Sequence, residues 1–141
     1  MGKRRRAREL ALQSLFYADA TSVSPEEALD LFCKNFPPPK DLDLFFRELV
    51  MGVIDNRDEI DQLIEQHSKN WKLYRISSVD LNLMRIAVYE FLHCPEVPRR
   101  VSINEAIDIG KRFGTEESGA FINGILDSIH LFLGKEKSGQ K

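Results

Sequence analysis

Hydrophobic residues recur every three to four positions along almost the whole chain. This spacing is the period of an amphipathic α-helix, and no run of strictly alternating residues bounded by turn signals predicts a strand. We therefore predict an all-α fold of about seven helices, arranged as two packed helical bundles that share one core. In this interpretation residues 1–134 form a single domain and residues 135–141 form a polar flexible tail.

Capping residues and prolines predict the helix boundaries in the first third of the chain. The first helix is expected over residues 3–20. Ser24 suits the N-cap of a second helix, with Pro25 at its first position. The three prolines 37–39 cannot continue that helix, so a third helix is expected to begin near Asp41.

In the middle of the chain, the polar cluster 55–58 predicts a break, after which the helical pattern resumes to about His67. The bulky side chains of residues 71–76 are expected to fill part of the core. Ser77 is then predicted to cap a fifth helix, with Asp80 three positions further on. This arrangement predicts two further helices between the third segment and residue 93.

Two more helices are predicted in the last third of the chain. Ser102 and Glu105 have the spacing of a capping box, and Gly114 is expected to end the helix that follows. Thr115 is predicted to cap the last helix, and Gly134 is predicted to end it.

Positive charge is concentrated at the start of the chain. Residues 3–8 read Lys-Arg-Arg-Arg-Ala-Arg, so five cations precede the first acid, Glu9. The whole chain carries −2 while residues 1–8 carry +5, which leaves −7 for the rest. Because the hydrophobic pattern runs straight on into a helix, we expect a row of cations in a fixed orientation that suits phosphates. A solubilising start with no ligand is the alternative.

The residues that usually carry catalysis or bind metal are few and scattered. His93 and Cys94 are neighbours, but successive side chains on a helix point about 100° apart and do not form a nucleophile and base pair. Asp55, Asp58 and Asp61 have helical spacing without the glycine turn of a calcium loop, which predicts a solvated acidic face. We therefore expect no catalytic residue, no metal and no cofactor.

The two cysteines and the charge spacing indicate the cellular compartment. Cys33 and Cys94 are single and far apart, which favours reduced thiols over a disulfide. Charged residues interrupt every apolar stretch, so neither a membrane span nor a secretory signal is predicted. We expect a cytoplasmic protein that does not contact membranes.

Four blocks of sequence have a distinctive combination of residues: 4–16, 79–90, 102–114 and 121–127. Together they resemble the NusB family of bacterial transcription antitermination factors, and the resemblance spans nearly the whole chain. The last two blocks are the most specific, because packing alone does not demand Asn104, Glu105, Asn123 and Gly124.

The resemblance implies a non-catalytic RNA-binding protein that pairs with the small-subunit ribosomal protein NusE and recognises boxA RNA. It also implies that the pair helps RNA polymerase to resist termination in rRNA operons, within an antitermination complex. By this similarity the RNA-binding residues are Lys3, Arg4, Arg5, Arg6, Arg8, Glu117 and Phe121. Phe16 and Asp80 would lie toward the protein partner, and Ala120 stands where the family pattern has a lysine.

Recognition of a defined RNA element needs more than cations. Five phosphate contacts at roughly −0.7 each would give a salt slope of about −3.5 for single-stranded RNA. Sequence is read when bases stack on an aromatic ring, for which Phe121 is the candidate, and when their edges are hydrogen-bonded, for which Gln13 and Asn123 are candidates. Phe121 could equally belong to the core.

Other functions are compatible with parts of the pattern. The chain could be a helical accessory domain of an RNA methyltransferase, or a purely protein-binding adapter whose basic start contacts an acidic neighbour. A homodimer that hides the RNA surface is also possible, but the sequence gives no interface for it. DNA binding by a helix-turn-helix is disfavoured because Glu116 and Glu117 stand where a reading helix would begin.

Overall fold

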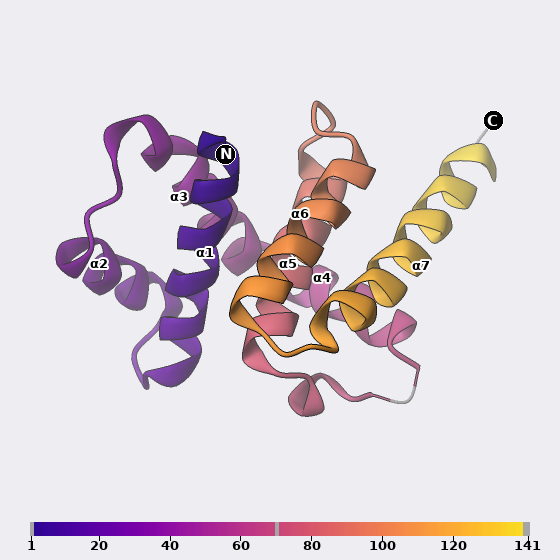
Figure 1. Cartoon of the computed structure of the whole chain (residues 1–141), viewed down its shortest axis with the longest axis horizontal. Helices are drawn as coiled ribbons and strands as arrows, with labels where there is room; N and C mark the ends of the chain where they lie inside the picture. The colour runs from indigo at the N-terminus through magenta and orange to yellow at the C-terminus, as the bar shows by residue number, and fades with distance from the viewer. Residues whose placement is uncertain (1, 70, 140–141) are drawn as a thin grey trace.

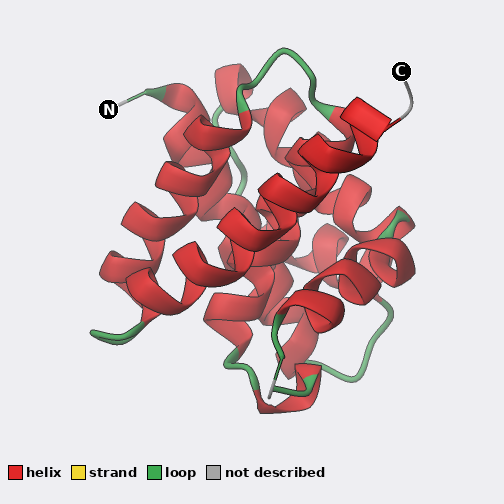
Figure 2. Ribbon diagram, turned by 90° about the vertical axis from the view of Figure 1, so that its right-hand side faces the viewer, coloured by secondary structure: helices red, strands yellow, loops and turns green. Residues whose placement is uncertain are grey.

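The computed structural model describes residues 2–69 and 71–139, and this part of the chain contains α-helices and no strand (Figure 2). The helices are α1 (Lys3–Ala20), α2 (Pro25–Asn35), α3 (Lys40–Asp55), α4 (Arg57–His67), α5 (Ser78–His93), α6 (Arg99–Phe113) and α7 (Ser118–Gly139). A single 3₁₀ turn, η1 (Leu73–Arg75), precedes α5. The predicted all-α class is confirmed.

The helices form two groups around one core (Figure 1). Helices α1, α2 and α3 make up the first group, and α4 to α7 make up the second. Helix α5 is the shared element, because every residue of 80–91 is buried and because it contacts α1 and α3 as well as α4, α6 and α7. All seven helices contribute to one continuous cluster of buried apolar side chains. This arrangement confirms two bundles with a common core.

Local sequence signals explain the boundaries of the first helices. The Ser24 Oγ accepts a hydrogen bond from the Glu27 N–H at 3.1 Å, and Pro25 is the first residue of α2. Helix α3 ends at Asp55, and Asn56 separates it from α4 with its side-chain amide bonded to the Gly52 carbonyl at 2.8 Å. The predicted cap at Ser24 and the predicted break are both confirmed.

The segment that leads into α5 differs from its prediction. Trp71 is 48% exposed and Tyr74 is 80% exposed, so these rings do not fill the core, and only Ile76 is buried. The prediction was therefore wrong for Trp71 and Tyr74, whereas Ile76 belongs to the core and Leu73 packs against it. The space between the bundles is filled by α5, whose residues 80–91 are all buried. Ser77 does cap α5, accepting a hydrogen bond from the Asp80 N–H at 3.2 Å.

Helix α6 begins three residues earlier than its predicted capping box. Its first residue is Arg99, directly after Pro98. Ser102 therefore lies inside the helix, where its hydroxyl donates to Glu90 Oε1 at 2.9 Å, and Glu105 pairs with arginines of α1. The prediction of a capping box was wrong because the side chains of Ser102 and Glu105 have partners on other helices.

The ends of α7 also differ from the prediction. The helix begins at Ser118, whose Oγ accepts from the Thr115 N–H at 2.9 Å, so Thr115 precedes the helix rather than capping it. The helix continues past Gly134 to Gly139. Gly134 does not take the positive φ with which a glycine commonly ends a helix. Residues 140 and 141 of the predicted tail lie outside the described residues.

Across residues 2–69 and 71–139, no helix has the length and apolar content needed to cross a bilayer.

Candidate nucleic-acid interface

Three cations of the first two turns of α1 point toward solvent. Lys3 and Arg6 have side chains that are 72% and 53% exposed, and Arg4 is exposed as well. The Lys3 Nζ lies 3.2 Å from an Asp41 carboxylate, and the Arg4 guanidinium lies 4.7 Å from the centre of the Phe45 ring. These contacts with α3 are at the surface, so the three cations remain accessible to a ligand. We call Lys3, Arg4 and Arg6 the α1 row.

Arg8 belongs to the same basic sequence but is buried. Its side chain is 4% exposed and makes a two-point pair with Glu90, with Nε at 2.8 Å and Nη2 at 2.7 Å from the carboxylate oxygens. Its Nη1 donates to Glu105 at 2.9 Å. Burial lowers the pKa of Arg8, but Glu90 and Glu105 outweigh it and raise that pKa overall. Arg8 therefore ties α1 to α5 and α6.

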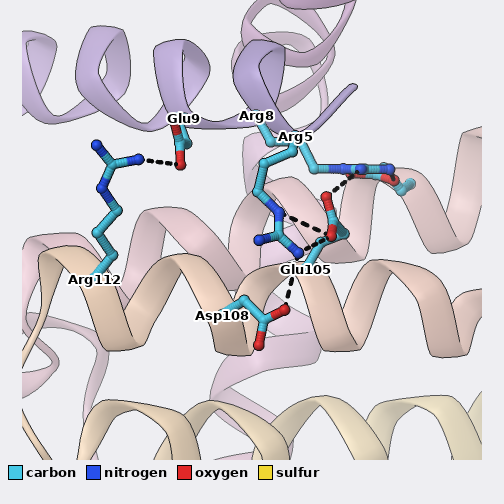
Figure 3. Close-up of polar contacts among 7 residues, drawn as sticks. Arg5, Arg8, Glu9, Glu105, Asp108 and Arg112 are labelled. Carbon is cyan, nitrogen blue, oxygen red and sulfur yellow. Dashed lines mark hydrogen bonds and ion pairs between the residues drawn. The ribbon is translucent and has the colours of Figure 1, made fainter. Parts of the chain in front are cut away.

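Arg5 is an intermediate case (Figure 3). Its side chain is 20% exposed and binds Glu105, with Nε 2.9 Å from Oε2, and Asp108, with Nη2 2.9 Å from Oδ2. The hydrogen bond to Glu105 is the main reason that the pKa of Arg5 is raised. Burial raises the pKa of Glu105, but the guanidinium groups of Arg5 and Arg8 outweigh it and hold that pKa below its ordinary value. Of the five predicted phosphate contacts, Arg5 and Arg8 are thus largely buried and held by carboxylates of the protein.

A further arginine approaches α1 from the last turn of α6. Arg112 is 64% exposed, and its Nη1 donates to Glu9 at 2.8 Å, as Figure 3 shows. The Arg6 Nη1 lies 3.4 Å from the other Glu9 oxygen. Sequence reasoning missed Arg112, although it follows Glu105 by seven positions and so lies on the same side of the helix.

The predicted aromatic contact lies at the start of α7. Phe121 is half-buried and packs against the core, and its ring meets that of Trp71 edge to face with centroids 6.0 Å apart. Both rings line a hollow of about 450 Å³, together with Lys69 and Gly124. A Cβ placed on Gly124 would have no neighbour within 4 Å, so this part of the hollow is open. Trp71 was not predicted as a site residue because it was expected in the core.

The remaining RNA-facing candidates lie on separate elements. Gln13 is half-buried in the middle of α1, and Asn123 is exposed on α7. Glu117 is exposed in the turn before α7. Their contact with RNA stays a prediction.

The two candidates for the protein partner differ in accessibility. Phe16 is 47% exposed on α1, so it offers an apolar ring to a neighbour. Asp80 is buried in the first turn of α5, and within the described residues its Oδ1 has no hydrogen-bond partner. Their roles are untested.

The acidic face that was predicted for Asp55, at the end of α3, and for Asp58 and Asp61, on α4, is only partly solvated. Asp55 and Asp58 are exposed, whereas Asp61 binds the buried Arg85 with oxygens at 2.8 and 3.0 Å. The prediction was therefore wrong for Asp61. In the described part of the chain, no group of three His, Cys, Asp or Glu side chains is placed to hold a metal ion.

Both cysteines are free thiols, and Cys94 is buried. Burial is the main cause that raises the pKa of Cys94 to about 12. A thiol with such a pKa is a poor nucleophile near neutral pH.

Fold and site together define a class of protein: an all-α chain of two bundles, with surface cations fixed on its first helix and an aromatic hollow at the start of its last. A family model described as the NusB family matches residues 5–130. The chain belongs to the NusB family, which is a family of transcription antitermination proteins and not of enzymes.

Relatives and solved structures agree with this membership. The transcription antitermination protein NusB of Desulfatibacillum aliphaticivorans is 82% identical over 141 residues, covering 100% of this chain and 99% of its own. The structure of Thermotoga maritima NusB superposes with a TM-score of 0.81 at 38% identity, covering 89% of each chain. A chain from a complex of antitermination factors NusB and NusE with double-stranded RNA has a TM-score of 0.80 at 26% identity, covering 92% of this chain and 96% of that one.

Proposed function

We propose that this protein is an RNA-binding antitermination factor of the cytoplasm that recognises boxA-type RNA together with NusE. It would support processive transcription of rRNA operons as part of an RNA polymerase antitermination complex. Family membership and the likeness to a chain from a NusB and NusE complex with RNA support this proposal. The observation that carries it is the α1 row, whose cations are exposed while the buried Arg8 beneath them fixes the helix.

The α1 row gives the phosphate-binding part of the proposed mechanism. Because Arg8 is bonded to Glu90 and Glu105, α1 keeps its orientation and the exposed cations need little ordering when RNA arrives. Each phosphate contact to single-stranded RNA contributes roughly −0.7 to the salt slope, so three contacts give about −2. This value replaces the slope expected for five contacts, since Arg5 and Arg8 are largely buried in their ion pairs whereas the pairs of Lys3 and Arg6 are at the surface.

The hollow beside α7 gives the base-reading part. Bases of a single strand can stack on exposed aromatic faces, and Phe121 and Trp71 provide such rings. Gln13 and Asn123 would donate to and accept from base edges, and the Glu117 carboxylate would accept from base amino groups. We propose that these side chains select the sequence while the α1 row supplies affinity.

NusE would bind on the side of Phe16 and Asp80. A second protein enlarges the surface available to one RNA strand, and linkage then requires that each ligand strengthen the binding of the other. A homodimer remains a prediction, and sedimentation of the free protein with and without RNA would test it.

A fluorescence titration with a boxA-like strand and a scrambled strand of equal composition, each with and without NusE, tests the proposal. We expect tighter binding of the boxA-like strand, and a further gain when NusE is present. Equal affinity for the two strands under all conditions would contradict sequence recognition. Equal affinity with and without NusE would contradict the cooperative role.

A further inference from the structure

We propose that the last turn of α6, with Lys111 and Arg112, is an additional contact for the RNA backbone. It would connect the α1 row to the hollow at Phe121. This inference rests on the RNA-binding function proposed above and adds residues that the sequence did not indicate. The ligand is the sugar-phosphate backbone of single-stranded RNA, so the contact is independent of base sequence.

Arg112 extends the cations of α1 onto a second helix. It shares the carboxylate of Glu9 with Arg6, at 2.8 Å and 3.4 Å respectively. Glu9 itself is nearly buried, with a side chain that is 7% exposed, whereas the two arginines are mostly in solvent. One carboxylate cannot neutralise two guanidinium groups, so this cluster keeps a positive charge at the surface. Its remaining N–H donors suit a phosphate.

Lys111 reaches in the other direction, toward α7. A Cβ placed on Gly119 would lie 3.2 Å from the Lys111 Cε and 3.5 Å from its Cγ, so the lysine stem crosses the first turn of α7. Gly119 is two positions before Phe121. Consecutive side chains on a helix point about 100° apart, which allows Arg112 to face α1 while Lys111 faces α7.

The position between the two patches gives these residues their proposed role. The turn from α6 to α7 carries Glu116 and Glu117, both exposed, and these acids repel phosphates. A strand that leaves the α1 row for the Phe121 hollow therefore needs cations at the end of α6 to offset that repulsion. Lys111 and Arg112 are the consecutive exposed cations at this place.

The variant Arg112→Gln tests the inference, with Arg100→Gln as the matched control. Arg100 is also on α6, is 55% exposed and has one surface carboxylate partner, Asp127, at 3.0 Å. We expect R112Q to make the salt slope of RNA binding smaller in magnitude by roughly 0.7, equally for boxA-like and scrambled strands. R100Q should leave the slope unchanged. R112K should keep the wild-type slope, because the charge is retained.

A double-mutant cycle with Glu9→Gln separates a phosphate contact from an indirect effect of unpaired Glu9. If Arg112 contacts RNA, R112Q weakens binding in the E9Q background as well. If R112Q weakens binding only when Glu9 is present, the inference is overturned. If the wild-type protein binds RNA but R112Q and R100Q have equal salt slopes, the inference is also overturned. If the wild-type protein does not bind RNA, the proposed function itself is refuted.

Discussion

Arginines within two turns of one helix take different roles here. Arg4 is at the surface, and Arg8, one turn further on, is buried against Glu90. The sequence predicted the cations but could not show which are exposed and which are buried, because the carboxylate that holds Arg8 lies 82 positions away in the chain. Phe121 is similarly both core and surface, since it packs against buried side chains and lines a hollow. The position of Phe121 on the apolar stripe could not reveal that its ring also lines a surface hollow.

At the residue scale, we predict that Glu90→Gln strongly destabilises the fold. The change leaves the buried Arg8 guanidinium with Glu105 as its ionised partner, and breaking a buried pair costs about 3 kcal/mol. Urea denaturation followed by circular dichroism measures this loss. Asp127→Asn, which removes the partner of the exposed Arg100, is the control and should cost less than about 1 kcal/mol. Similar losses in both variants would show that Arg8 is not an anchor.

The helices show where local sequence is sufficient and where it is not. Ser24 and Ser77 cap their helices as predicted, because an N-cap is decided by residues three positions apart. Ser102 and Glu105 have the same capping-box spacing, yet they lie within α6 and bind groups on α5 and α1. The boundary was missed because tertiary partners outweighed a local capping pattern.

At the element scale, we predict that Glu105 makes the docking of α1 on α6 sensitive to acid. Its pKa is lowered in the folded protein, mainly by Arg5, while the unfolded chain has the ordinary value of 4.5. The unfolded state therefore takes up the proton first as pH falls. The stabilisation by Glu105 is complete above the ordinary pKa and is lost as pH falls through the lowered one.

Chemical denaturation of wild type and Glu105→Gln at a series of pH values measures this effect. The difference in unfolding free energy between the two should be largest near neutral pH and should shrink below pH 4.5. A difference that does not change with pH would mean that Glu105 is not held ionised by the α1 arginines.

At the scale of the whole molecule, the proposed RNA surface depends on the joining of the two bundles. Helix α1 belongs to the first bundle, but its arginines are bonded to α5 and α6 of the second. The cations of α1, the end of α6 and the start of α7 are thereby placed in a fixed relation. Hydrophobic periodicity predicted the two bundles, but it contains no information about which faces of distant helices meet. Arg112 was missed for this reason.

The salt dependence of RNA binding by Arg4→Gln/Arg6→Gln tests most directly whether the α1 row binds the phosphates. Its control is Arg47→Gln/Arg100→Gln, which removes the same charge from exposed arginines of α3 and α6. The account predicts that the salt slope of the first variant is smaller in magnitude by about 1.4 and that the control keeps the wild-type slope. Helix content should be unchanged in both variants. Equal slopes for the two double variants would contradict it.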